Sequence, residues 1–238
     1  MGEFIRAATY NIHRMTGRDG RRDPDRIADV IRALDADLVG LQEVDWRDEP
    51  QSGKAQYEPA DRLKGYQAVA GPNLQDYRGH YGNLLLVRGK ICNVRRVKLG
   101  EAGREPRGAV IAEVIVRGRM LRCVTTHFGL RLGERRRQSA KLAQAIANGN
   151  EDKPLVLLGD FNEWLPRSPG LRALLCQGTS QVGQAKSFPS CFPIFGLDRI
   201  LTRKLGPVME VRAFDTPLAR VASDHLPVVA TFRLADLA

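Results

Sequence analysis

Short runs of apolar residues recur along the chain, and several of them end abruptly in a polar residue. Residues 155–158 form such a run, rich in branched side chains and without alternation, which is typical of a strand buried on both faces. Residues 5–13 and 37–44 have a similar form. Strands are also predicted over 66–70, 83–88, 94–99, 108–116, 120–126, 197–201, 208–214 and 227–232. The pattern predicts a protein rich in β-sheet whose polar side chains collect where strands end.

Two segments have the periodicity of amphipathic helices. The first places apolar residues at positions 27, 30, 31 and 34, and Asp23-Pro24 supplies a capping acid and a first-turn proline. The second covers about 134–147, and a shorter helix is predicted over 171–175. The segments 48–65, 71–82 and 176–196 are predicted to be loops, and Arg117-Gly118-Arg119 a tight hairpin.

The order of strand, helix and acid-ended strand occurs twice, over 5–43 and again over 121–160. An architecture of two layers of mixed sheet with flanking helices would accommodate two such halves. We predict a single domain over residues 1–238, since a chain of this length can bury one large core and shows no linker or low-complexity segment. No apolar stretch approaches the roughly 18 residues of a membrane span, and the first residues lack a signal-peptide core, so a cytoplasmic protein is expected.

Composition narrows the class of partner without choosing one. The chain has 37 basic and 27 acidic residues, a net charge of +10, which attracts nucleic acid, anionic lipid head groups and phosphorylated metabolites alike. The four cysteines are far apart and lack zinc or thioredoxin spacing, so buried reduced thiols are predicted. The sequence is silent on oligomeric state.

Eight polar residues stand at the ends of apolar runs, and their chemistry is that of a hydrolytic site. They are Asn11, Glu43, His127, Asp160, Asn162, Asp198, Asp224 and His225. Carboxylate and carbonyl oxygens are the ligands that Mg²⁺ prefers, and histidines beside acids serve as general acids or bases. Asp160 and Asn162 are two residues apart, so on extended chain they share a face; an Asx turn that closes the strand is the alternative.

The order of these residues in the chain resembles that of a known superfamily. The motifs are Thr9-Tyr10-Asn11-Ile12-His13, Gln42-Glu43-Val44, Thr126-His127, Gly159-Asp160-Phe161-Asn162, Leu197-Asp198-Arg199-Ile200 and Ser223-Asp224-His225-Leu226-Pro227. They resemble the ordered motifs of the endonuclease/exonuclease/phosphatase superfamily and span essentially the whole chain. The resemblance implies an α+β fold, the four-layered αββα sandwich of deoxyribonuclease I, with two pseudo-symmetric mixed sheets flanked by helices.

The resemblance also implies a metal site. Glu43 would be the principal ligand of Mg²⁺, for which Mn²⁺ could substitute. Asn11 would lie in the metal and phosphate shell, and Asp224 in the metal shell. Glu43 as a plain surface acid is the alternative.

The remaining roles concern catalysis. Asp160 would orient or deprotonate the attacking water, and Asn162 would donate to the phosphate oxygens. His225 would be the base or the phosphate-polarising imidazole, with Asp198 as its orienting carboxylate. His127 would serve the leaving oxygen or the phosphate.

Several residues keep two interpretations. Arg107 either binds phosphate or is solvated, and His13 either lines the site or is structural. Asp198 has an ion pair with Arg199 or another arginine as its alternative role. The basic residues of the second helix, Arg135, Arg136, Arg137 and Lys141, are expected to form a solvated face rather than a polyanion groove.

One departure from the family pattern concerns His127. The segment Tyr81-Gly82-Asn83 stands where secreted deoxyribonucleases have a second acid, so no carboxylate is expected behind this imidazole. Direct deoxyribonuclease activity is therefore a weaker expectation than hydrolysis of phosphoesters in general.

The sequence thus predicts a Mg²⁺-dependent phosphoesterase that cleaves phosphodiesters, with nucleic acid slightly favoured as substrate. A lipid or small-molecule phosphodiesterase or phosphatase, similar to sphingomyelinases or inositol phosphatases, is the alternative. A non-catalytic module that binds polyanions is the third hypothesis, from a different class.

Overall fold

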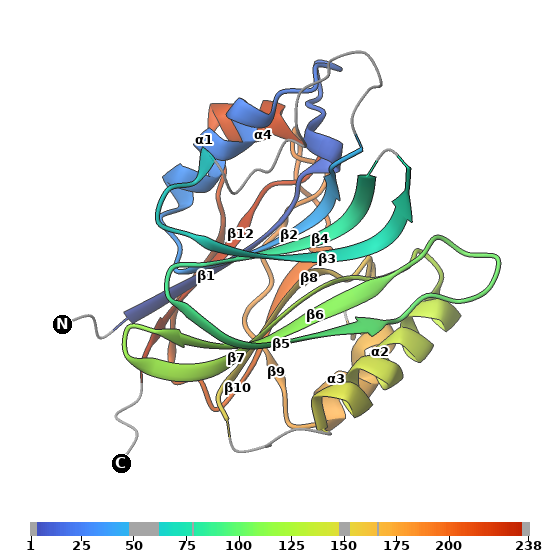
Figure 1. Cartoon of the computed structure of the whole chain (residues 1–238), viewed down its shortest axis with the longest axis vertical. Helices are drawn as coiled ribbons and strands as arrows, with labels where there is room; N and C mark the ends of the chain where they lie inside the picture. The colour runs from blue at the N-terminus through green and yellow to red at the C-terminus, as the bar shows by residue number, and fades with distance from the viewer. Residues whose placement is uncertain (1–3, 48–61, 78, 148–152, 166, 235–238) are drawn as a thin grey trace.

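The computed structural model describes residues 4–47, 62–77, 79–147, 153–165 and 167–234. Within these residues the chain forms two six-stranded sheets that pack face to face. Figure 1 shows four layers from top to bottom: helices α1 (Pro24–Leu34) and α4 (Pro217–Ala222), the first sheet, the second sheet, and helices α2 (Leu132–Ala147) and α3 (Arg172–Cys176). The predicted αββα sandwich is confirmed.

The first sheet has the strand order β11-β12-β1-β2-β4-β3. Its central pair, β1 and β2, is parallel, and the other neighbours are antiparallel. Its strands are β1 (Phe4–Asn11), β2 (Leu38–Asp45), β3 (Gln67–Asp76), β4 (Gly79–Val87), β11 (Val208–Ala213) and β12 (Val228–Arg233).

The second sheet repeats this arrangement with the order β5-β6-β7-β8-β10-β9. Here β7 and β8 form the parallel pair, connected through α2 as β1 and β2 are connected through α1. Its strands are β5 (Lys90–Lys98), β6 (Gly108–Val116), β7 (Arg119–His127), β8 (Leu155–Asp160), β9 (Ser180–Gln181) and β10 (Asp198–Arg203). The two halves predicted from the sequence are therefore present as equivalent strand orders.

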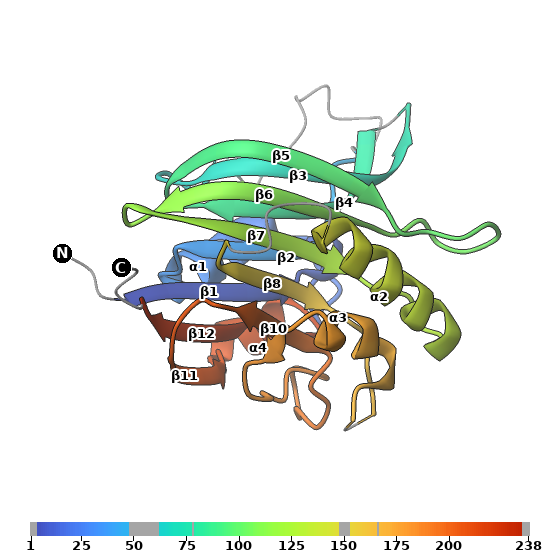
Figure 2. The same ribbon diagram turned by 90° about the horizontal axis from the view of Figure 1, so that it is seen from below.

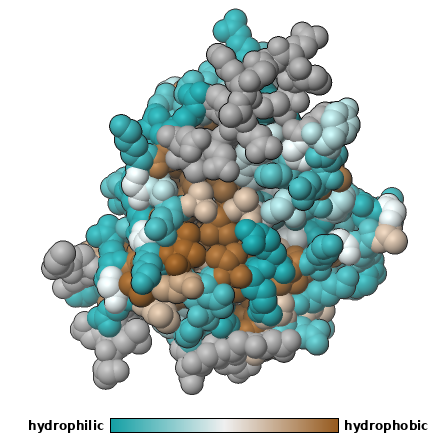
Figure 3. Space-filling view, viewed as in Figure 1, coloured by the Kyte–Doolittle hydropathy of each residue, from teal (hydrophilic) through white to brown (hydrophobic). Residues whose placement is uncertain are grey.

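Three apolar clusters lie between the four layers. One packs α1 and α4 against the outer face of the first sheet, and another fills the space between the sheets. The third packs α2 and the segment 171–174 against the second sheet, and Figure 2 shows α2 and α3 in front of that sheet. Hydrophobic residues also gather in the middle of the face seen in Figure 3, between the edge strands β3 and β5, where Ile91 and Val94 are partly buried.

Local sequence explains where the first helix and the hairpin form. Asp23 caps α1, its side chain accepting from the backbone N–H of Arg26 at 3.0 Å, and Pro24 occupies the first turn as predicted. Arg117 and Gly118 both have positive φ, 50° and 79°, which is the conformation of a two-residue hairpin turn. The predicted hairpin between β6 and β7 is confirmed.

The predicted loop over 71–82 is wrong, because β3 continues to Asp76 and β4 begins at Gly79. Pro72 is tolerated since β3 is an edge strand, and its pairing with β4 shifts register between Pro72 and Leu74. The sequence did not predict α4, and the 176–196 loop contains the short strand β9. Of the predicted loop 48–65, residues 48–61 lie outside the described part of the chain, and the single-domain assignment stays a prediction.

The four cysteines are free thiols, but only Cys123 is buried. Cys92 and Cys176 are exposed and Cys191 is partly exposed, so the prediction of four buried thiols is wrong for these three. Cys92 lies on β5, an edge strand with one face toward solvent. Among the helices of the described residues, none is long and apolar enough to cross a membrane.

Candidate active site

The predicted site residues converge at one end of the sandwich. Asn11 is the last residue of β1, His127 of β7 and Asp160 of β8. The carboxyl ends of parallel strands meet at the same edge of a sheet, which brings these side chains together. In the register of the second sheet His127 pairs with Asp160 on one side, and Asp198, the first residue of β10, pairs with it on the other. Residues from both sheets thus meet at Asp160.

Asp160 lies at the centre of this cluster and is almost completely buried. Its Oδ2 accepts from Asn11 Nδ2 at 3.0 Å and lies 3.4 Å from His127 Nε2 and 3.8 Å from His225 Nε2. Burial raises the pKa of Asp160 to about 6, the negative charge of Asp198 adds to this, and the positive charge of His225 opposes it. The carboxyl therefore changes protonation close to neutral pH.

His225 is held by a carboxylate, as the resemblance implied. Its Nδ1–H donates to Asp198 Oδ2 at 2.7 Å, and Ser187 Oγ donates to the same oxygen at 2.5 Å. Burial lowers the pKa of His225, but the charge and hydrogen bond of Asp198, followed by the charges of Asp160 and Asp224, raise it to about 10. The imidazole is thus positively charged at neutral pH.

The alternative pairing of Asp198 with Arg199 is wrong. The guanidinium of Arg199 instead donates to the carbonyl oxygens of Gly196 and Glu163 and to Gln181 Oε1. Neighbouring residues on a strand point to opposite faces, which separates Asp198 from Arg199.

His127 has an arginine behind it rather than a carboxylate. Arg107 Nη1 lies 2.9 Å from His127 Nδ1, and because a guanidinium only donates, we assign the proton of the neutral imidazole to Nε2, which faces Asp160. Burial, then the charges of Arg107 and His225, hold the pKa of His127 well below its usual value. Asn83 donates to Gly108 O instead, at 3.0 Å, in agreement with the predicted lack of an acid at 81–83.

The contact of Arg107 with His127 excludes one of the two interpretations of Arg107, that of a solvated side chain. Its side chain is buried and donates to Glu105 Oε2 at 2.8 Å as well, so a solvated arginine is wrong. Phosphate binding by Arg107 stays a prediction.

Asn162 lies just after the strand, in the Asx turn that was the alternative interpretation of this segment. Its backbone N–H donates to Asp160 Oδ1 at 2.9 Å, and its φ of 48° shows that the chain is no longer extended there. Its Nδ2 lies 3.1 Å from His127 Nε2 and donates to Phe128 O at 2.9 Å. The turn therefore places the amide beside the carboxylate, so the structural and functional interpretations coexist.

Glu43 and Asn11 form the part of the site contributed by the first sheet. Asn11 Nδ2 donates to Glu43 Oε1 at 3.1 Å as well as to Asp160. Glu43 is half-buried and has a φ of 56°, within the register shift between Leu41 and Val44 on β2. This irregularity re-aims the carboxylate toward Asn11.

His13 and Asp224 lie at the rim of the site and are both partly exposed. His13 Nδ1 lies 3.1 Å from Thr16 O and 3.9 Å from Asp224 Oδ1, and the backbone N–H of His13 donates to Asn11 Oδ1 at 3.0 Å. Ser223 Oγ lies 3.3 Å from Asp224 Oδ1. His13 thus has both a structural contact and a place beside the site.

Two sets of side chains could hold a cation. In the described residues, the ligand atoms of Asp160, Asp198 and His225 lie within 4.8 Å of one another. However, His225 is protonated and bound to Asp198, which opposes a cation there. The set implied by the resemblance, Glu43 with Asn11 and Asp224, offers two carboxylates and no charged imidazole. Asn11 in this set directs its Nδ2 to Glu43, and its Oδ1 accepts from the backbone N–H of His13.

Sequence reasoning missed residues from the 176–196 loop and from α2. Ser187 orients Asp198, and the ring of Phe188 lies 4.8 Å from that of His225. Arg135, expected on a solvated face, is buried with Nη2 3.4 Å from Glu163 Oε1. The other three basic residues of that face, Arg136, Arg137 and Lys141, are exposed as predicted. In the sequence, the position of Glu163 directly after Asn162 was the one signal for the buried pair of Arg135 and Glu163.

The sandwich, with acids and imidazoles gathered at one end, is the architecture of hydrolases that act on phosphoester bonds. The chain belongs to the endonuclease/exonuclease/phosphatase family, whose model matches residues 8–225. Enzymes of this family are generally metal-dependent.

Individual proteins resemble the chain over nearly its whole length. The uncharacterized protein YbhP of Escherichia coli strain K12 is 27% identical, covering 97% of this chain and 96% of its own. An endonuclease/exonuclease/phosphatase from Beutenbergia cavernae is similar in structure, with a TM-score of 0.75 and 25% identity over 97% of this chain and 72% of that one. A mannosyl-6-phosphatase from Bacteroides thetaiotaomicron has a TM-score of 0.76 and 17% identity, over 95% and 98% of the two chains, and shows the fold alone.

Proposed function

We propose that the protein is a Mg²⁺-dependent phosphodiesterase, with nucleic acid as its favoured substrate. The observation that carries the proposal is the surroundings of Asp160. A buried carboxyl group with a near-neutral pKa lies within 4 Å of side-chain nitrogens from Asn11, His127 and His225, which come from three separate segments. At hydrolytic sites, neighbouring acid and base groups have pKa values that their surroundings shift apart, and this cluster has the same pattern.

The protonation states suggest a division of roles. Asp160, ionised above about pH 6, accepts the proton of the attacking water through Oδ2. His225, charged and held by Asp198, donates from Nε2 to a non-bridging phosphate oxygen and stabilises the charge that grows there. Asn162 donates to the same group of oxygens. Neutral His127 donates a hydrogen bond to the leaving oxygen through Nε2–H, and the leaving alkoxide takes its proton from water.

The residues present fit a hard divalent cation. Glu43 Oε1 accepts from Asn11, and in the described part of the chain its Oε2 has no hydrogen-bond partner. Glu43 with Asn11 and Asp224 would hold Mg²⁺, or Mn²⁺ in its place, by oxygen atoms. The ion would neutralise phosphate charge during the reaction. Arg107 and His13 are proposed to assist phosphate binding from the two sides of the site.

The net charge of the chain favours one class of substrate, and the comparisons keep a second class in view. The net charge of +10 favours a polyanion, and we propose nucleic acid before a lipid or a small phosphoester. A lipid or small-molecule phosphodiesterase or phosphatase is the second candidate, and a Bacteroides protein of the same fold is named as a mannosyl-6-phosphatase. We expect the protein to act in the cytoplasm.

The test is hydrolysis by purified protein of bis(p-nitrophenyl) phosphate, p-nitrophenyl phosphate and a single-stranded oligonucleotide, with Mg²⁺, Mn²⁺ or EDTA. We expect diester cleavage that EDTA abolishes, and a loss of about 10²-fold or more in Glu43→Gln and Asp160→Asn. Glu210→Gln on exposed β11 is the matched control and should be unchanged. A wild-type protein that binds oligonucleotides but cleaves none of the three substrates would support the polyanion-binding module instead.

A further inference from the structure

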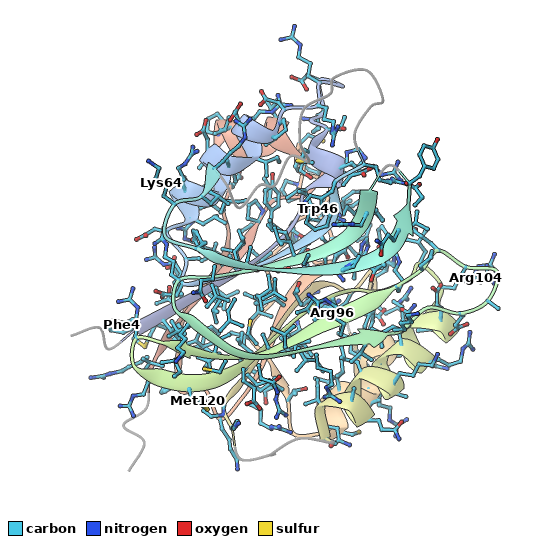
Figure 4. The ribbon with its side chains drawn as sticks, viewed as in Figure 1. Phe4, Trp46, Lys64, Arg96, Arg104 and Met120 are labelled. Atoms are coloured by element: carbon cyan, nitrogen blue, oxygen red, sulfur yellow. The ribbon has the colours of Figure 1, made fainter. Side chains whose placement is uncertain are left out.

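A groove of about 600 Å³ lies beside the proposed active site. Its walls are the edge strand β3, the end of β5 and the loop 99–107, so it follows the opening between the two sheets. Figure 4 shows Arg96 between β3 and β5 and Arg104 on the loop that follows β5. A volume of this size is that of a ligand pocket rather than of a packing defect.

Glycines allow the strands to approach closely along the groove. A Cβ on Gly108 would lie 2.4 Å from Asn73 Oδ1, and one on Gly71 would lie 2.3 Å from Val110 Cγ2. The loop 99–107 is closed by two backbone hydrogen bonds, from the N–H groups of Leu99 and Gly100 to Arg107 O at 2.8 and 2.9 Å. The groove is therefore built from ordered backbone on both sides.

The charge of the groove is strongly positive. Four cationic side chains line it, Arg96, Lys98, Arg104 and Arg107, together with one acid, Glu101, and Arg107 is paired with Glu105 at 2.8 Å. The carboxylate of Glu101 is engaged by Arg137 through two contacts of 2.7 Å. Arg96 Nε donates to Ala70 O at 2.7 Å, which holds this side chain across the gap between the sheets. The lining therefore attracts an anion.

Arg107 connects the groove to the site. It lines the groove, and its Nη1 donates to His127 Nδ1, whose Nε2 faces Asp160. The groove thus lies one side chain away from the imidazole that faces Asp160. The lining also offers the amides of Asn73 and Gln75 and the apolar surfaces of Pro72 and Val97, which suit a base and a sugar.

We propose that this groove binds the nucleotide next to the scissile phosphate in a single-stranded nucleic acid, with Lys98 and Arg104 contacting its backbone phosphates. This inference rests on the proposed phosphodiesterase function and deepens it, because it names a strand rather than an isolated ester as the substrate. Single-strand binding in a cationic groove depends on salt, since each phosphate contact releases counterions.

The test compares two double variants that change the net charge equally. Lys98→Glu/Arg104→Glu reverses the groove, and Lys64→Glu/Lys90→Glu reverses two exposed lysines outside it. Lys90 is on the same strand as Lys98, roughly 26 Å away at about 3.3 Å per residue. Thermal melts show whether the charge-reversed groove variant folds. If it does not fold, Lys98→Ala/Arg104→Ala replaces it.

Binding of a fluorescein-labelled oligothymidylate is measured by anisotropy in EDTA over a range of salt. We expect the groove variant to weaken binding about tenfold or more, with a salt slope lower by about 0.7 for each phosphate that the variant no longer neutralises, and the control variant to weaken it much less. The rate on bis(p-nitrophenyl) phosphate of the control variant, Lys64→Glu/Lys90→Glu, should equal that of the wild type. Equal weakening in both double variants, or no binding by the wild type, would overturn the proposal.

The remaining outcomes separate this proposal from its alternatives. If the groove variant loses sedimentation with phosphatidylglycerol vesicles but keeps oligothymidylate binding, the groove serves a lipid head group and the proposal is wrong. If the wild type binds oligothymidylate through the groove but hydrolyses no diester, the proposed function fails while the groove assignment holds. If it hydrolyses bis(p-nitrophenyl) phosphate and the groove variant binds normally, only the groove assignment fails.

Discussion

Asp198→Asn is the substitution that tests the electrostatics of the site most directly. The asparagine keeps the size of the side chain and an oxygen that can accept from His225 Nδ1, but it removes the negative charge. Asp198 is the first of the groups that raise the pKa of His225, and burial, the largest influence, acts against it. Without the charge of Asp198, burial is opposed mainly by the weaker influences of Asp160 and Asp224 on the pKa of His225.

The magnitude follows from the two pKa values. The pKa of about 10 lies above the ordinary 6.5, and at about 1.36 kcal/mol per pKa unit the difference corresponds to about 5 kcal/mol in favour of the charged imidazole. We expect the pKa of His225 in Asp198→Asn to fall below 6.5, so that the ring is neutral at pH 7. Diester hydrolysis should decrease by about 10²- to 10³-fold, the range for a lost donor to the charge of the transition state.

The assay is an NMR titration of the four imidazoles in metal-free protein, with His225 assigned by its absence in His225→Gln. Asp29→Asn on the exposed face of α1 is the control and should leave the titration of His225 unchanged. If His225 in Asp198→Asn still titrates above about pH 9, the charge of Asp198 does not hold its proton, and the reasoning is refuted.

Three further predictions concern stability. The raised pKa of His225 stabilises the fold fully below pH 6.5, and this contribution is lost as the pH rises through about 10, so urea denaturation should show the wild type losing more stability than His225→Gln over that interval. Arg135→Met leaves the buried carboxylate of Glu163 without its cation and should cost about 3 kcal/mol, whereas exposed Arg136→Met should change the free energy of unfolding by less than about 0.5 kcal/mol; equal effects would contradict the buried pair. Gly40→Ala places a Cβ 2.7 Å from Thr125 Oγ1 and 2.8 Å from Leu158 Cβ, between the sheets, and should cost about 1–3 kcal/mol, while Gly133→Ala on helix α2, with ordinary contacts, should not destabilise the protein.

The sequence was most informative at the centre of the sheets. Strands β2 and β8 are buried on both faces, so their unbroken apolar runs predicted both the strands and the acids at their ends. Edge strands gave a weaker signal. Gly71-Pro72 marks a loop in most contexts, and only the position of β3 at the edge of its sheet lets the strand continue.

Contacts between distant segments were beyond the sequence. Nothing local to Arg107 or His127 indicates that they lie 2.9 Å apart, and the buried setting of Arg135 depends on Glu163, which a helical pattern does not reveal. Ser187 and Phe188 come from a segment without periodicity, so their contacts with Asp198 and His225 required the folded chain. Periodicity predicts which face is buried and is silent on which polar groups are buried together.

The hydrogen bond from Asn11 to Asp160 joins the two halves of the molecule at the place where chemistry is proposed. Neither repeat possesses a complete centre, since one brings the amide and Glu43 and the other brings the buried acid and an imidazole. A shift of one sheet against the other would therefore separate these groups even with every site residue in place.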